Sequence, residues 1–400
     1  MTAPDAAAAA AVPGQPVLDV NANDAVYYDT GYWNDLAAVQ EMFRRRISDG
    51  KPGHWFGDFF ERTGAQGRRG LFLNCGNGWV EREMVMAGLV AEGVGIDYSD
   101  GLLQEAQRAA EALDLPLAYH QMNVNTAAFP LQEFDLVVNH AAAHHITMID
   151  RVFREICRLL PEDGWFLSFD YIGPHRNQYS PVAWERAWSL NNELPEALRQ
   201  SMEYQHVPTM VQVDPTEAVH SELIVEMLHR YFHVERFVPL GGAIAYPLLT
   251  HNARLFACTD AAAKDAWVDA VLRADEEFLH EHPDSSLFAY VEAKPNKEAL
   301  AQPEALAAWE QEEAAREARA QAEGGIYYPF GALQDAYDRL VTERTVTAQL
   351  RTQVADLQGQ LEAIRQDPMV SRLTRLRGSR LAQELRRVPG VRTLIDRIRH

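Results

Sequence analysis

The sequence contains little cysteine and no long hydrophobic run. Its 400 residues include three cysteines, Cys75, Cys157 and Cys258, which are odd in number and lack C-x-x-C spacing. This pattern argues against a disulfide framework or a zinc site, so we expect a reduced protein without a bound metal. No stretch approaches the ~20 consecutive apolar residues that a membrane span needs. The sequence therefore predicts a cytoplasmic protein.

Positive charge is also scarce. The formal net charge is -20, so a phosphate backbone would repel the chain, and we expect no nucleic-acid partner. Lysine occurs only four times, and this arginine bias together with abundant alanine indicates a bacterial source. Residues 1–19 begin with an alanine-rich run that has no basic start, which does not resemble a signal peptide. We expect this segment to be disordered.

What the sequence does contain is an alternation of short β-rich runs with helical patterns from Arg69 onward. This alternation is typical of βαβ units and a parallel sheet. Strands are predicted at residues 70–74, 93–97, 134–140, 164–171, 232–240 and 287–293. Helices are predicted at 100–113 and 148–160, where apolar residues recur at every third or fourth position. We therefore expect an α/β domain over residues 20–296, with a Rossmann-like, doubly wound and mostly parallel sheet.

A turn of small residues follows the first predicted strand. Asn74, Gly76 and Gly78 precede a helix, and small residues there let the backbone approach a ligand closely. The third glycine of the dinucleotide fingerprint is missing, which disfavours NAD. Asp97 ends the second strand, where a carboxylate can accept hydrogen bonds from both hydroxyls of a ribose. The turn predicts a nucleoside site, and capping of the helix that starts near Ser99 is the alternative role for Asp97.

Several segments resemble the successive motifs of a known family. LFLNCGNGWVERE, GVGIDYS, FDLVVNHAAAHHI and LLPEDGWFLSFDYIGP occur in the order found in class I S-adenosylmethionine (SAM)-dependent methyltransferases. With the motifs at 170–176 (DYIGPHR) and 214–218 (DPTEA), the sequence is most similar to bacterial methyltransferases associated with sugar and polysaccharide biosynthesis. The resemblance covers about residues 21–295. It implies a seven-stranded sheet and SAM as the cofactor.

The same resemblance implies which residues bind SAM. Asn74, Gly76 and Gly78 would contact the methionine part, and Asp97 the ribose. The remaining residues of the predicted cofactor site lie near the adenine or beside the turn, and they are Tyr98, Asn123, Val124, Asn139 and His140.

Three histidines, His140, His144 and His145, follow the strand predicted at 134–140. Open α/β sheets build their sites at such strand ends. A hydroxyl acceptor needs a general base, for which His145 is the first candidate and His144 the second. Asp170 ends the next strand, where it could polarise the histidine or bind a substrate hydroxyl. Packing or capping of a helix start is the alternative role for each histidine.

Five further residues are predicted to face the acceptor. Tyr171, His175 and Arg176 follow the strand at 164–171, and Arg176 could meet an anionic group. Tyr32 and Trp33 belong to an aromatic segment that covers the cofactor in the family. Ordinary hydrophobic packing is the alternative for these two aromatic residues.

Three functions are compatible with these patterns. The first is O-methylation of a sugar, glycan or glycolipid intermediate. The second keeps the enzyme but takes a small metabolite or a lipid carboxylate as the acceptor. The third is a non-catalytic adaptor, which Phe72, Asn74 and Asn123 support because they replace residues usual in the family. The Asn-Pro-Pro-aromatic signature of nucleic-acid amino methyltransferases is absent, because His140 and Ala141 follow Asn139.

Three segments follow the predicted domain. Residues 297–330 form an acidic helical linker by their composition, and residues 331–366 carry a heptad pattern that predicts a coiled coil and a homo-oligomer. Residues 367–400 contain nine arginines and three acidic residues beside an apolar stripe. This amphipathic tail has the pattern of an interfacial helix, which predicts reversible contact with the inner face of the bacterial membrane. Docking on the coiled coil or on the acidic helix predicted at 303–322 is the alternative.

Overall fold

A computed structural model describes residues 31–323 and residue 354, with gaps at 52, 66, 130–132, 206, 208–209, 211–213 and 215. Contacts divide the chain into two units, Met1–Pro329 and Phe330–His400. All described residues except Val354 belong to the first unit. The predicted N-terminal segment 1–19, coiled coil 331–366 and tail 367–400 therefore lie outside the described residues, apart from Val354.

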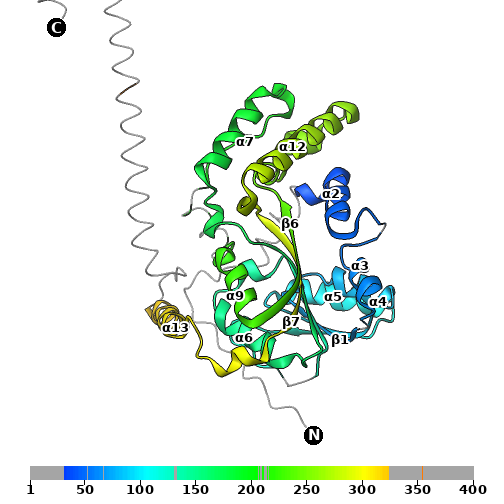
Figure 1. Cartoon of the computed structure of the whole chain (residues 1–400), viewed down its shortest axis with the longest axis vertical. Helices are drawn as coiled ribbons and strands as arrows, with labels where there is room; N and C mark the ends of the chain where they lie inside the picture. The colour runs from blue at the N-terminus through cyan, green and yellow to red at the C-terminus, as the bar shows by residue number, and fades with distance from the viewer. Residues whose placement is uncertain are drawn as a thin grey trace, which may run out of the picture. The chain divides into compact units, whose positions relative to one another are not determined.

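A seven-stranded mixed sheet runs through the described part of the first unit (Figure 1). Its strand order is β3-β2-β1-β4-β5-β7-β6. The strands are β1 (Gly67–Leu73), β2 (Val90–Asp97), β3 (Leu117–Gln121), β4 (Leu136–His140), β5 (Trp165–Tyr171), β6 (Phe232–Gly241) and β7 (Phe288–Pro295). Neighbouring strands from β3 to β5 run parallel, whereas β7 is antiparallel to both β5 and β6. This confirms the predicted Rossmann-like, mostly parallel sheet.

Strands that are buried along their whole length were easier to predict from the sequence than the exposed edge strand β3. In β4 and β5 nearly every side chain is buried, because helices cover both faces of a parallel sheet and such strands are continuously apolar. The edge strand β3 is different, since only Leu117 is buried and His120 and Gln121 are exposed. This strand was not predicted, because its five residues lack a continuous apolar run.

Helices lie on both faces of the sheet. Figure 1 shows α3 (Gly57–Thr63), α4 (Trp79–Met86) and α5 (Asp100–Ala112) on one side, and α6 (Ile149–Leu159) and α9 (Ile224–Tyr231) on the other. Two core clusters fill the layers, one around Phe59 and Phe72 and the other around Phe153, Ile156 and Phe166. The apolar residues of α6 recur at three and four positions, so one stripe faces the sheet.

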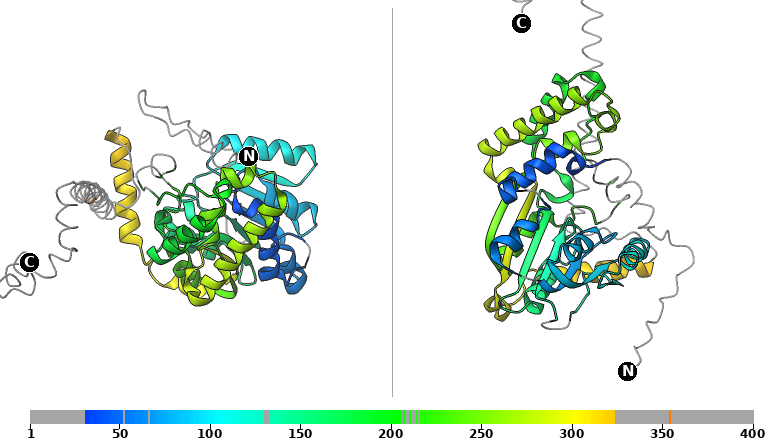
Figure 2. Two further views of the ribbon diagram at one scale, coloured as in Figure 1. Left: turned by 90° about the horizontal axis from the view of Figure 1, so that it is seen from above. Right: turned by 90° about the vertical axis from the view of Figure 1, so that its right-hand side faces the viewer.

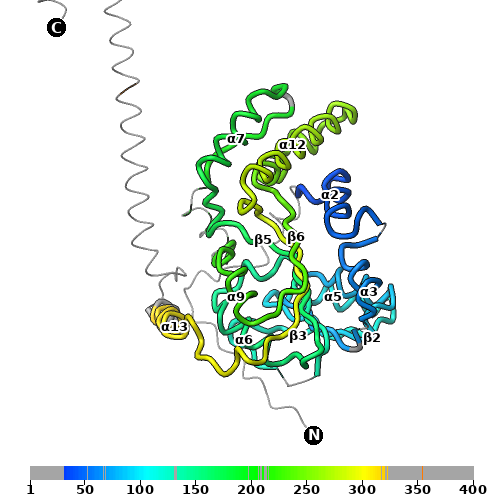
Figure 3. Tube along the Cα trace, in the orientation of Figure 1, coloured from blue at the N-terminus to red at the C-terminus, as the bar shows by residue number. Residues whose placement is uncertain are grey.

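A cap of helices lies beyond the carboxyl ends of β4 and β5 (Figures 2 and 3). It consists of α2 (Ala37–Ser48), α7 (Pro181–Glu193), α10 (Ala245–Leu249), α11 (Ala253–Ala257) and α12 (Ala261–Glu281). A third core cluster joins these helices to the ends of β5 and β6 through Phe169, Tyr171 and Leu240. The cap therefore stands over the end of the sheet where α/β folds bind ligands.

The last described helix, α13 (Ala307–Glu323), occupies part of the predicted acidic linker. Its Glu310 is 5% exposed and accepts hydrogen bonds from the backbone N–H groups of Asp150 and Arg151. A carboxylate at the start of a helix satisfies N–H groups that have no partner within the helix. Glu310 thus fastens α13 to the first turn of α6. None of the described helices is long and apolar enough to cross a membrane.

Candidate active site

The turn between β1 and α4 has the backbone conformation that its sequence predicts. Asn74, Gly76 and Gly78 have φ values of 41°, 55° and 75°. A Cβ atom at Gly78 would lie 2.5 Å from the Tyr119 hydroxyl oxygen, so only glycine fits there. The Asn74 side-chain amide donates to the carbonyl of Ala142 at 3.3 Å. This bond joins the turn to the segment that follows β4.

Asp97 at the end of β2 holds the same turn. Its Oδ2 accepts from the backbone N–H of Gly76 and its Oδ1 accepts from that of Ser99, both at 2.8 Å. Each carboxylate oxygen keeps a second lone pair, which is available to a ribose hydroxyl. The side chain that caps α5 is that of Ser99, which accepts from the Leu102 N–H. Asp97 is thus placed for a ligand at the carboxyl ends of β1 and β2.

The other predicted cofactor residues differ in their exposure to solvent and in their contacts. Tyr98 is 60% exposed, whereas Val124 is 6% exposed. The Asn123 amide oxygen accepts from the Asn125 N–H at 3.0 Å. His140 is stacked between Trp55 and Phe169, and burial lowers the pKa of His140 to about 4, so its ring is neutral.

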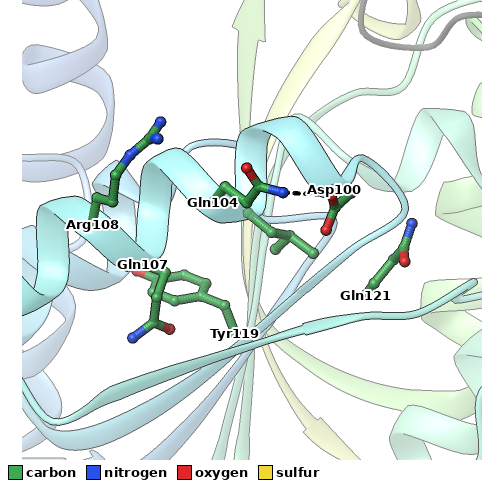
Figure 4. Close-up of a pocket in the computed structure, with 7 residues that line it drawn as sticks. Asp100, Gln104, Gln107, Arg108, Tyr119 and Gln121 are labelled. Carbon is green, nitrogen blue, oxygen red and sulfur yellow. Dashed lines mark hydrogen bonds between the residues drawn. The ribbon is translucent and has the colours of Figure 1, made fainter.

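A shallow pocket of about 360 Å³ lies between α5 and β3 (Figure 4). It is lined by residues of α5, among them Asp100, Gln104 and Arg108, and by Tyr119 and Gln121 of β3. Its lining includes none of the predicted cofactor residues. The pocket nevertheless adjoins that site, because Gln121 pairs with Asp97 between β3 and β2 and the Tyr119 hydroxyl lies beside Gly78.

Asp170 is the central anchor of the segment after β4. The side chain is 1% exposed. Its Oδ2 accepts from the Asn139 amide at 2.7 Å and from the N–H groups of Ala142 and Ala143 at 3.1 and 2.6 Å. Burial alone would raise the pKa of Asp170, but the charge of His144 and these hydrogen bonds outweigh it, so the pKa lies below its usual range. Asp170 is therefore a permanent anion that fixes the turn.

His144 is bound to this anion. Its Nδ1 lies 2.6 Å from Asp170 Oδ1, and its Nε2 lies 3.8 Å from Glu217 Oε2. Burial would lower the pKa of His144, but the nearby Asp170 and Glu217 carboxylates raise it to about 9. His144 is therefore protonated near neutral pH, which does not suit a general base.

His145 faces the same carboxylate from the other side. Its Nε2 lies 3.7 Å from Glu217 Oε2, and its Nδ1 lies 3.1 Å from the Thr216 hydroxyl. That hydroxyl donates its proton to Asp214 Oδ1 at 2.7 Å, so it accepts from Nδ1–H of His145. In this tautomer Nε2 carries the free lone pair, and His145 has the form of a base.

Comparison with known proteins complements this geometry. The family model described as a methyltransferase domain matches residues 71–168, which run from β1 through β5. The chain is a SAM-dependent methyltransferase. Its cofactor is therefore SAM, as predicted.

Two curated relatives and one solved structure are similar to the methyltransferase. The EEF1A lysine methyltransferase 4 of Bos taurus is 25% identical over 201 residues, which cover 45% of this chain and 75% of the relative. The malonyl-[acyl-carrier protein] O-methyltransferase of Legionella pneumophila is 31% identical over 121 residues, or 30% of this chain and 42% of the relative. A SAM-dependent methyltransferase structure from Mesorhizobium loti aligns with a TM-score of 0.36 and 20% identity, over 57% of this chain and 91% of that one.

On the acceptor side of the methyltransferase, Arg176 and His175 hold the segment that carries Glu217. Arg176 is 1% exposed and donates through Nη1 to the Glu217 carbonyl at 2.9 Å. His175 Nδ1 lies 2.9 Å from the Val219 carbonyl oxygen, and burial lowers the pKa of His175 to about 4. In the structure its Nη1 binds the main chain, and the predicted contact of Arg176 with an anionic group stays a prediction. Both residues thus position Glu217.

The predicted aromatic residues are mostly packed. Trp33 is 2% exposed and lies in the cap core against Phe43, Tyr246 and Phe288. Tyr171 is 4% exposed, and its hydroxyl donates to the Pro174 carbonyl. Tyr32 is partly buried and packs edge-on against His251. For Trp33, ordinary packing is the role that the structure shows.

Glu217 and Asp214 are the site residues that the sequence reasoning missed. They belong to the DPTEA motif at 214–218, which contributed to the family resemblance but received no chemical role. The signal was a pair of carboxylates in one short motif. Their meeting with His144 and His145 depends on tertiary structure, because His175 and Arg176 draw the motif back to the turn after β4.

Several site residues have a left-handed backbone conformation. Among the described residues, eight non-glycine positions have a positive φ, and five of these lie in the segments that form the site. These five positions are Asn74, Ala141, Arg176, Asn177 and Ala218. Each such residue costs about 1–3 kcal/mol and persists only where the surrounding contacts impose it.

Proposed function

We propose that this enzyme is an O-methyltransferase whose acceptor is a hydroxyl of a sugar, glycan or glycolipid intermediate. The observation that carries the proposal is the cluster that His144 and His145, on the turn after β4, form with Glu217 of the 214–218 motif. The Asn74–Ala142 hydrogen bond ties this turn to the predicted methionine site. Methyl donor and cluster thus share one edge of the sheet, which is where an acceptor must lie for in-line transfer.

The chemistry assigns different roles to the two histidines. An alcohol must lose its proton as its oxygen attacks the methyl carbon of SAM and the carbon–sulfur bond breaks. His145 Nε2 accepts this proton, because the Thr216–Asp214 pair holds the other ring proton on Nδ1. His144, already protonated and bound to Asp170, orients the turn.

Electrostatics favour a neutral acceptor over an anionic one. Asp170, Asp214 and Glu217 place three carboxylates around two histidines. Like charges 4 Å apart repel by about 4 kcal/mol at an effective dielectric constant of 20. A fatty-acid or other carboxylate acceptor would meet this repulsion, whereas a sugar hydroxyl would not. The sugar class itself comes from the sequence resemblance.

The test is a methyl-transfer assay with labelled SAM and a panel of acceptors. The panel contains sugars and sugar nucleotides, fatty acids, and lysine peptides, since one relative is named for lysine methylation. We expect transfer to hydroxyl acceptors that is lost in His145→Ala and kept in the control His120→Ala, an exposed histidine on β3. Transfer confined to carboxylates or to amines would contradict the proposal.

We further propose that residues 331–366 make the enzyme a homo-oligomer and that residues 367–400 bind it to an anionic membrane surface. Both proposals rest on sequence patterns in segments outside the described residues. Light scattering gives the mass of the particle and hence its number of subunits. A chain truncated before Gly331 should form particles with fewer subunits than the full chain. The full chain should float with anionic liposomes at low salt, and a chain ending at Gln366 should not. An equal number of subunits in both chains would refute the oligomer proposal, and equal flotation would refute the membrane proposal.

A further inference from the structure

We propose that His144, His145 and Glu217 bind one divalent transition-metal cation. Each residue offers one ligand atom, and the three atoms lie within 4.8 Å of one another. The role of the cation in methyl transfer rests on the proposed function, but its binding does not.

The distances within the trio fit a shared ion better than direct hydrogen bonds. Glu217 Oε2 lies 3.8 Å from His144 Nε2 and 3.7 Å from His145 Nε2. Both separations exceed the 2.7–3.2 Å of an N–H···O hydrogen bond. Two ligands about 2.1 Å from one metal lie about 3.4 Å apart at the tetrahedral angle. If the Glu217 carboxylate moved a few tenths of an ångström toward each ring, its oxygen and the two Nε2 atoms could therefore bind the same ion.

Each of the three ligands is oriented by a second residue. Asp170 holds Nδ1 of His144, Thr216 holds Nδ1 of His145, and the Asn177 amide donates to Glu217 Oε1 at 3.4 Å. Metal-binding histidines almost always donate their other ring N–H to a carboxylate or a similar acceptor, which fixes the tautomer and aims Nε2 at the ion. The same arrangement is present on both rings.

Charge also favours a cation between these side chains. Asp170 is 1% exposed, and the side chains of Glu217 and Asp214 are 13% and 19% exposed. When both imidazoles take the neutral form that metal ligands need, these three carboxylates leave a negative site that is largely shielded from water. Arg176 contacts the same segment, but through Nη1 it binds the main-chain oxygen of Glu217. A divalent cation would balance the charge at the point where the ligands meet.

The donor set indicates the class of metal. Two imidazoles and one carboxylate suit Zn²⁺ or Fe²⁺, whereas Mg²⁺ and Ca²⁺ prefer oxygen ligands. The sequence was expected to bind no metal, because cysteine spacing gave no ligand pattern. The present ligands come from one histidine pair and a distant glutamate, so no local spacing reveals them.

A bound cation would change how the acceptor is activated. Three protein ligands leave positions open for the acceptor oxygen, and coordination lowers the pKa of a hydroxyl. The proton then leaves to water, because Nε2 of His145 is occupied as a ligand. Metal binding thus replaces the general base of the metal-free site.

The test is a titration of the chelator-treated full chain with Zn²⁺ by calorimetry and with Co²⁺ by visible absorption. We expect one equivalent bound, with an affinity at least tenfold lower in His145→Ala and in Glu217→Gln. His229→Ala and Glu226→Gln serve as matched controls, because both residues are exposed on α9. They should bind as the wild type does.

Two outcomes would overturn the inference. One is the absence of a stoichiometric ion from the wild type, and the other is unchanged affinity in the double variant His145→Ala/Glu217→Gln with its fold intact by circular dichroism. Full methylation of a hydroxyl acceptor by metal-free enzyme would also refute the role of the metal while leaving the proposed function standing. Stoichiometric metal binding without methyl transfer to any hydroxyl acceptor would refute the proposed function and leave the metal site standing.

Discussion

The replacement Asp97→Ala tests the cofactor site most directly. Both carboxylate oxygens are already held by backbone N–H groups, at Gly76 and Ser99, and each retains a lone pair for a ribose hydroxyl. Charge-assisted hydrogen bonds contribute ~1.5–3 kcal/mol each. Two of them amount to about 3–6 kcal/mol, which corresponds to a ~10²–10⁴-fold loss of affinity. Loss of the bond to Gly76 adds to this effect, because it loosens the turn.

The assay is calorimetric titration of the wild type and the variants with SAM. Asp97→Asn should give an intermediate affinity, since the amide keeps one acceptor oxygen. The control is Asp100→Ala, which removes an exposed carboxylate that accepts from Gln104 in the first turn of α5. Unfolding midpoints should show that each variant folds. If the affinity for SAM falls less than tenfold in Asp97→Ala and is unchanged in Asp100→Ala, the ribose is not bound by Asp97.

Three further changes test the acceptor side and the interior. His145→Ala should lower turnover by ~10²–10⁴-fold at nearly unchanged SAM affinity, as measured by initial rates and titration, and a wild-type rate would show that His145 has no role in activating the acceptor. Asp170→Asn should destabilise the protein by ~3–5 kcal/mol in urea unfolding, because it leaves the buried His144 without its counter-ion, and an unchanged midpoint would contradict the ion pair. Glu81 is 1% exposed, and burial raises its pKa from 4.5 to about 7, so the wild type should lose about 3 kcal/mol of stability as the pH rises through that interval. Glu81→Gln, which stays neutral, should not show this loss, and parallel urea curves for both proteins at pH 4.5 and pH 8 would disprove the shift.

Much of the α/β domain could be predicted because its signals are local. Six of the seven strands coincide with strands predicted from the sequence, and the helices at 100–113 and 148–160 begin and end within one residue of α5 and α6. The turn at Asn74, Gly76 and Gly78 was also predicted from residue type alone, because a left-handed backbone favours these residues. β3 lacked such a signal, because it has five residues and only Leu117 is buried.

The candidate site was predicted only in part, because its other half depends on contacts between distant segments. The histidines were found from their place after a strand, and Asp170 from the next strand. Glu217 reaches them through tertiary contacts of its segment, in which Arg176 and His175 bind the main chain and the Val219 N–H donates to the His144 carbonyl. In a sequence, an arginine in a polar loop suggests contact with a ligand more readily than contact with the main chain. That Arg176 is buried is visible only in the folded chain.

The left-handed residues at Ala141 and Ala218 have a consequence for engineering. Glycine at either position would relieve a backbone cost of roughly 1–2 kcal/mol, part of which the greater freedom of the unfolded chain would offset. Ala141 separates His140 from the histidine turn, and Ala218 follows Glu217, so both alanines restrict the hinges of reactive segments. A screen for thermostable variants could select glycine there and recover enzymes with lower turnover. Stability and activity would then be traded against each other at two small side chains that lie next to predicted site residues.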